Sequence, residues 1–235
     1  MPNTHSKKLD LLPTKKILTP LLAAAFILGG SFVVSNIGKG NIQEAPLSDT
    51  DNLIYTKENR TAKEIEYKEQ IREALVSATK DKAVVSPDEE GANNTKKFVF
   101  KDIDVIPADD DQTLKQYGTG LGNILKTYSY SDKKSLVGIT LDLYNTKDET
   151  YAESLTKAEE KTITAIDSLK KMKVPKNLGI YHLALLNDLL VSAFYIGNMQ
   201  TIKENPQLGL VATEEYSLKM YDVASDLTLI NTYMA

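Results

Sequence analysis

Three glycines in the stretch GTGLG, residues 118–122, are of a kind that can cradle a phosphate group. A phosphate loop needs a strand that ends at the glycines and a helix that starts from them, with a Lys and a hydroxyl or an acidic ribose partner. That context is missing, and the carboxylates of Asp109 to Asp111 just upstream would repel a phosphate. Because the apolar period continues through the glycines, we predict that Gly118 and Gly122 mark close helix packing or a local kink.

His182 is the only histidine in the part of the chain that we expect to fold, and Asn187 and Asp188 follow it. A metal site needs several converging ligands, and a second histidine or a cysteine is not available. No Gly-x-Ser-x-Gly turn supports a Ser-His-Asp arrangement either. We therefore predict no catalytic residue, no metal ligand and no cofactor, and a structural or interaction role for the polar side chains of His182 and Asn187.

A group of acidic side chains precedes the glycines and could in principle hold a hard cation such as calcium. The group comprises Asp102, Asp104, Asp109, Asp110 and Asp111. The Asp-x-Asp-x-Asp-Gly loop with its distal Glu is missing, so we expect these acids to be solvated loop residues, with Asp109 to Asp111 also available as helix caps.

Composition narrows the class of protein further. The chain has 235 residues, a net charge of -4 and no Cys, which removes disulfides, thiolate nucleophiles and a lipid-bearing cysteine. Four lysines and one aspartate give residues 1–16 a net charge of +3. The rest of the chain therefore has a net negative charge. A basic face for nucleic acid is therefore not expected.

Residues 17–37 contain no charged side chain, and as a helix they would span about 31 Å, enough to cross a bilayer. The lysines lie before this segment and acids follow it, so the positive-inside rule places the N-terminus in the cytoplasm. We predict a short basic cytoplasmic tail at 1–16, a transmembrane signal-anchor at 17–37 and a linker at 38–56. The alternative is a signal peptide cleaved near Ser35.

Residues 57–235 are predicted to form an extracytoplasmic helical domain, an all-α antiparallel bundle with an acidic loop at 81–112. Apolar residues recur at spacings of three and four along most of it. Three helix starts are expected, at Ser131, at a Thr146–Glu149 capping box and at the Asn205–Pro206 pair. Alternating residues late in the acidic loop look strand-like, but the sequence offers no second strand, so we expect an extended segment along the bundle.

The stretch VPKNLGIYHLALLNDLL, followed after one helix by NPQLGL and preceded by QYGTGLGNIL, resembles an uncharacterised group of bacterial single-anchor helical proteins. The shared features are the Val174–Pro175 turn, His182 near a helix start, the Leu-Leu-Asn step that ends at Asn187, and a Pro that opens the last helix. This chain has Asn205 where the group more often has Asp. The resemblance implies an exported helical domain, encoded near pilus or type IV secretion-like machinery, and carries over no functional residue.

Together these patterns predict a non-enzymatic envelope protein that is anchored by one helix and binds or scaffolds another protein, or itself. A ligand-binding sensor-like module is the alternative, although about sixteen residues before the membrane are too few for an output domain. A hydrolase acting on envelope polymers is a third possibility. It would need two facing carboxylates converging in a cleft, and the sequence gives no reason for any two acids to meet.

Overall fold

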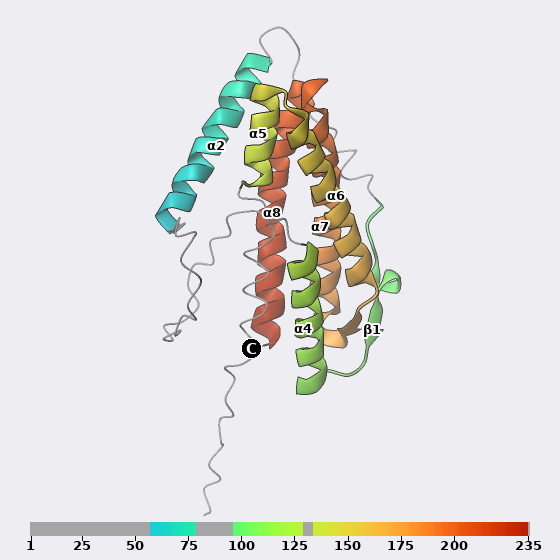
Figure 1. Ribbon diagram of the computed structural model, residues 1–235. Coiled ribbons are helices and arrows are strands. Elements are labelled where there is room, and N and C mark those ends of the chain that lie inside the picture. The colour runs from blue at the N-terminus through green and yellow to red at the C-terminus, as the bar shows by residue number, and fades with distance from the viewer. Residues whose placement is uncertain (1–56, 79–95, 129–133, 235) are drawn as a thin grey trace, which may run out of the picture.

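The computed structural model describes residues 57–78, 96–128 and 134–234, with side chains in the first segment described from Ile65 onward. The predicted tail 1–16, membrane segment 17–37 and linker 38–56 lie outside these residues, as does the first half of the acidic loop. The described part is mostly helical, so the prediction of an all-α fold is confirmed (Figure 1).

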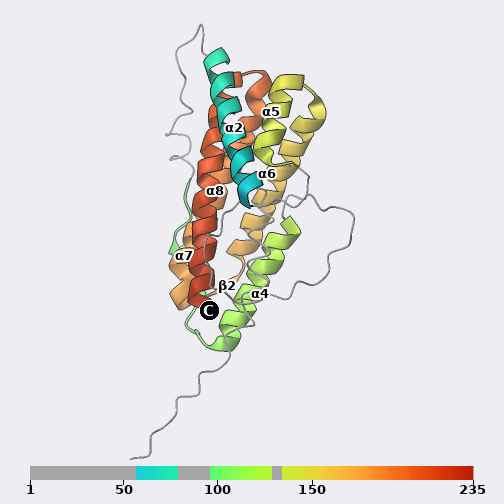
Figure 2. The ribbon, with the colours of Figure 1, turned by 90° about the vertical axis from the view of Figure 1, so that its left-hand side faces the viewer.

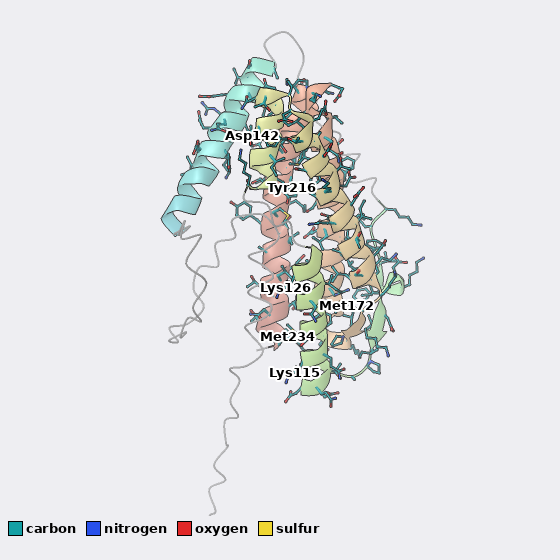
Figure 3. The ribbon with its side chains drawn as sticks, viewed as in Figure 1. Lys115, Lys126, Asp142, Met172, Tyr216 and Met234 are labelled. Carbon is teal, nitrogen blue, oxygen red and sulfur yellow. The ribbon has the colours of Figure 1, made fainter. Side chains whose placement is uncertain are left out.

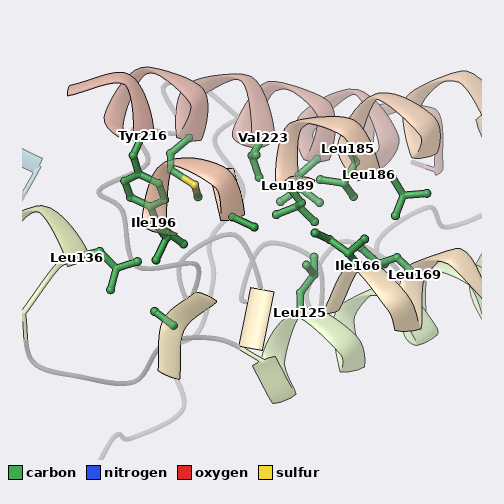
Figure 4. Packing of buried hydrophobic residues seen from close by; sticks show 14 of the residues in the cluster. Leu125, Leu136, Ile166, Leu169, Leu185, Leu186, Leu189, Ile196, Tyr216 and Val223 are labelled. Carbon is green, nitrogen blue, oxygen red and sulfur yellow. The ribbon is translucent and has the colours of Figure 1, made fainter. Parts of the chain in front are cut away.

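Two long helices form the centre of the fold. α7 (Gly179–Met199) and α8 (Pro206–Met234) are joined by the short 3-10 helix η3 (Gln200–Lys203), so they pack side by side in opposite directions. Figures 1 and 2 show α8 running along most of the length of the described structure. Side chains of α7 such as Leu189 and Ile196 are buried beside Val223 and Tyr216 of α8 (Figure 4). Each such side chain contributes about 1.5–3 kcal/mol of transfer free energy.

Four further helices of the described residues pack around this pair. α6 (Glu149–Lys170) packs on α7, α4 (Asp111–Tyr128) packs on α6, α5 (Leu136–Thr146) packs on α6 and α8, and α2 (Lys57–Ala78) packs on α8 and α5. The amphipathic periods of these segments explain their orientation, since Leu121, Leu125, Leu155 and Leu169 are all fully buried. α2 uses only a narrow apolar stripe around the buried Ile71, and its described exposed side is mostly polar, with Ile65 and Val76 as exposed apolar residues.

Two expected helix starts agree with the structure, the first being Asp110 at the start of α4. Asn205 caps α8 by accepting a hydrogen bond from the Leu208 amide at 3.2 Å, as expected. The predicted capping box of Thr146 and Glu149 is wrong, because Thr146 ends α5 and Asp148 caps α6 by accepting from the Thr150 amide at 2.9 Å. Ser135 caps α5 through the Gly138 amide; Ser131, the expected cap, lies outside the described residues.

The acidic loop does contain a short strand, and the expectation of an unpaired extended segment is wrong. β1 (Asp104–Ile106) pairs in parallel with β2 (Lys173–Pro175), with Val105 opposite Val174. β2 lies directly after α6, where the Pro175 ring ends the helical pattern and supplies an extended backbone. Three residues are too few to show an alternating pattern, so this partner strand could not be recognised from its residues alone.

One helical segment in the described part of the chain, Lys176–Lys203, is long and apolar enough to cross a membrane by length and composition. About half of it is buried inside the fold, where α6 and α8 pack against it. The core helix of a domain has the same composition as a membrane span, and the packing of α7 between two other helices is that of a core helix.

Candidate functional site

The side chain of His182 is completely buried between α4, α6 and α7. Its Nδ1 lies 2.9 Å from the hydroxyl of Tyr117, and its Nε2 lies 3.2 Å from the carbonyl oxygen of Leu169. A carbonyl oxygen only accepts, so Nε2 carries the proton and donates it to Leu169, while Nδ1 accepts from Tyr117. Both ring nitrogens are therefore used within the fold.

Burial keeps this imidazole neutral. It lowers the pKa of His182 to about 4, against an opposing effect of the hydrogen bond with Leu169. Burial also raises the pKa of the Tyr117 hydroxyl well above its usual range. The neutral imidazole joins α7 to α4 through Tyr117 and to α6 through the Leu169 carbonyl oxygen, so it is suited to fixing helix positions. Of the two roles predicted for His182, this favours the structural one.

Asn187 holds the segment before β1 against α7. Its Oδ1 accepts from the amide of Phe98 at 2.8 Å, and its Nδ2 donates to the carbonyl oxygen of the same residue at 3.2 Å. The side-chain amide thus pairs with one backbone unit in the way that a neighbouring strand would. Asn187 therefore has a structural use too.

Gly118 and Gly122 are both buried, on the face of α4 that also carries Leu121 and Leu125. The glycine between them has a close neighbour, because a Cβ on Gly120 would lie 3.3 Å from Cε of Met172. Figure 3 shows Met172 beside α4, between Lys115 and Lys126. The close-packing role of Gly118 and Gly122 stays a prediction.

Four of the five acids are exposed, as expected, and one of these four also caps a helix as expected, whereas Asp109 is only partly exposed. Asp110 caps α4 through the amide of Thr113 at 2.9 Å, and hydrogen bonds with Thr113 lower the pKa of Asp110. Asp109 accepts from Asn177 and, at 3.0 Å, from the hydroxyl of Tyr233, so it ties the loop before α4 to the end of α8. Because the two carboxylates bond to different elements, they position helices and do not converge on a cation.

A cluster of charged side chains, which we call the α7–α8 cluster, lies between the two central helices. It consists of Asp188 from α7 with Lys219, Asp222 and Asp226 from α8. The ammonium group of Lys219 lies 3.3 Å from Asp188 and 2.7 Å from Asp222, and it bonds to both. The cluster thus contains three carboxyl groups and one lysine. The lysine bonds to Asp188 and Asp222 and not to Asp226.

Asp226 is the member of the cluster that the lysine does not bond. Its side chain is buried, with 9% of the residue exposed, and its Oδ2 has no hydrogen-bond donor among the described residues. The carboxyl group of Asp188 faces it from α7. Burial, with the facing Asp188 charge second, raises the pKa of Asp226 from 3.8 to about 7. A proton held between the two carboxyl groups would satisfy the otherwise unpaired oxygen.

The pairing of Asp188 with Asp226 differs in geometry from the site of a glycoside hydrolase. Such enzymes hold their carboxyl groups about 5–9.5 Å apart, so that a sugar or a water fits between them. Asp188 faces Asp226 from α7, and Oδ2 of Asp226 is buried between the helices. A buried carboxyl oxygen of this kind can hold a proton and is closed to a sugar chain.

A different kind of feature lies on the solvent side of α8. The exposed positions of this helix from its third turn onward recur at spacings of three and four, and we call them the α8 outer face: Glu214, Leu218, Tyr221, Asp222, Ser225, Thr228, Leu229, Thr232 and Tyr233. Four are large apolar residues that are 41–50% exposed, two are acidic, and none is basic. On α2 and α6, by contrast, the large exposed apolar residues of the described chain are more isolated, such as Ile163 on α6.

Comparison with known proteins identifies no relative of this chain. No protein-family model, no curated protein and no solved structure matches the chain. What the protein does is therefore inferred from its own residues.

Proposed function

We propose that the protein is anchored in a cell membrane by residues 17–37 and that its helical domain, an antiparallel bundle outside the membrane, binds another protein of the cell envelope. The N-terminus lies in the cytoplasm in this proposal. The protein is a non-enzymatic scaffold or adaptor, of the kind found in a secretion or pilus-type assembly.

The α8 outer face is the observation that carries the binding role. Leu218 and Leu229 are eleven residues apart, which is about 16 Å along a helix, so the apolar side chains form a stripe rather than a single spot. Asp222, Ser225 and Thr228 lie between the two apolar pairs, Leu218 with Tyr221 and Leu229 with Tyr233. Single exposed apolar residues are normal on any protein, whereas several that recur along one helix face among polar residues are typical of a protein-binding surface.

The buried polar side chains also favour a binding role for the surface. His182 and Asn187 are occupied by hydrogen bonds that hold helices and a loop segment together. Asp226, the buried acid of the described residues, faces the carboxyl group of Asp188 on the neighbouring helix. These side chains support the fold, and the surface is left as the place for recognition.

The membrane part of the proposal rests on the uncharged run at 17–37 and the lysines before it. α7 is the other apolar segment of sufficient length, but its packing against α6 and α8 is used by the fold. An anchor ahead of residue 57 would leave all of the described helices on one side of the membrane.

Topology can be tested with single cysteines, since the chain has none of its own. Cysteine at the exposed Glu214 should react with a membrane-impermeant maleimide added to intact cells, and cysteine at Ser6 should react only after permeabilisation. The protein should remain in the membrane fraction after a carbonate wash. Labelling at Ser6 in intact cells would refute the orientation, and release by carbonate would indicate cleavage near Ser35.

A further inference from the structure

The α7–α8 cluster contains more acidic groups than basic ones. Lys219 bonds to Asp188 and Asp222, so one positive charge faces three carboxyl groups. Asp226 is buried with an unpaired oxygen, and the carboxyl group of Asp188 faces it from α7. Two ionised carboxylates that face each other away from water repel each other strongly, and a shared proton removes the repulsion.

We propose that Asp188 and Asp226 form a proton-binding site that couples the packing of α7 against α8 to pH. With one proton bound, the carboxyl groups hydrogen-bond each other and the helices stay in close contact. When the proton leaves, the buried carboxylate of Asp226 faces a second negative charge, and the contact loosens. This inference is independent of the proposed binding role.

The direction of the effect follows from the pKa of Asp226, which is about 7 in the folded protein and ordinarily 3.8. Between these values the folded protein holds the proton and the unfolded chain does not. The free energy of unfolding therefore decreases as the pH rises from about 4 to about 7, and the loss is complete above 7. The charged groups that face Asp226 from both helices are Asp188, Asp222 and Lys219, and the lysine alone acts in the opposite direction.

His182 acts against this trend, so the wild-type curve alone does not report on the pair. Its pKa is about 4 in the folded protein and 6.5 ordinarily, which means that the unfolded chain binds its proton more readily. Stability from the neutral imidazole is complete above pH 6.5 and is lost as the pH falls towards 4. The two opposing contributions partly cancel, and a difference between variants is needed.

The test compares the melting temperature of the full-length protein in nonionic detergent with that of Asp226→Asn from pH 4.5 to 8.5. Asparagine keeps the shape of the side chain and cannot ionise. We expect the melting temperature of D226N relative to wild type to rise by roughly 3–6 °C across this range and to level off above pH 7. Asp188→Asn should flatten the profile as well, whereas Glu214→Gln, an exposed acid on the same helix, should leave it parallel to wild type.

A distance measurement distinguishes a looser contact between α7 and α8 from a change in the free energy of unfolding alone. Nitroxide labels on cysteines at the exposed Ile180 and Thr232 report the distance between α7 and α8. The distance distribution should broaden above pH 7 in the wild-type background and stay unchanged in D226N. Parallel melting curves of wild type and D226N, or identical distance distributions at pH 5 and pH 8.5, would overturn the proposal.

Discussion

Replacing Gly209 with alanine should lower the free energy of unfolding by about 2–3 kcal/mol, although alanine favours a helix by about 1 kcal/mol. Gly209 lies in the first turns of α8, where η3 passes very close. A Cβ at this position would lie 2.5 Å from Cβ and 2.7 Å from Cα of Ile202. Because Cα is part of the backbone and Ile202 is fully buried, the connection between α7 and α8 would have to move.

Gly120→Ala is the matched control, since it adds the same methyl group to another helix. The nearest atom to its Cβ is the flexible tip of Met172 at 3.3 Å. We expect this variant to be neutral or more stable by up to about 1 kcal/mol. Thermal unfolding of both variants, followed by circular dichroism, measures the difference. Equal melting temperatures for the two variants would contradict the close approach of Ile202.

Replacing His182 with alanine should cost about 3–5 kcal/mol, the largest effect that we expect from a polar residue. The change opens a cavity among buried helices and leaves both the Tyr117 hydroxyl and the Leu169 carbonyl oxygen without a partner. Tyr117→Phe removes only one hydrogen bond and should cost about 1–2 kcal/mol.

The double variant tests whether the two side chains act together. With Tyr117→Phe already in place, His182→Ala no longer strands a buried hydroxyl, so the double variant should be more stable than the sum of the single effects implies. The acid-induced loss of stability between pH 6.5 and 4 that comes from His182 should also disappear in H182A. Additive single effects would show that the hydrogen bond does not couple α4 to α7.

Much of the helical architecture follows from local patterns in the sequence. The apolar spacings of α4, α6 and α8 predicted helices close to those observed, and Asn205 before Pro206 predicted the start of α8. The wrong helix starts involve choices between neighbouring polar residues, such as Thr146 and Asp148, which have similar capping ability. Only the path of the chain decides between them.

The α7–α8 cluster could not be found in the same way, because Asp188 and Asp226 are far apart in the sequence and meet only after α7 and α8 pack. One signal was present. Asp226 lies between Val223 and Leu227 within the apolar stripe of the last helix, and an acid in a buried stripe needs a partner. Asn187 is a similar case, since nothing local indicates that its amide pairs with the backbone of Phe98.

The proposed binding of a partner protein through the α8 outer face is tested most directly by photocrosslinking in the native membrane. A benzophenone amino acid placed at Leu229 or Leu218 in the full-length protein should form one discrete adduct with another envelope protein. The same group at Ile163, an equally exposed apolar position on α6, should not form it. A Leu229→Glu change should abolish the adduct formed from Leu218. No protein adduct from either α8 position, or the same adduct from Ile163, would contradict the proposed role of this face.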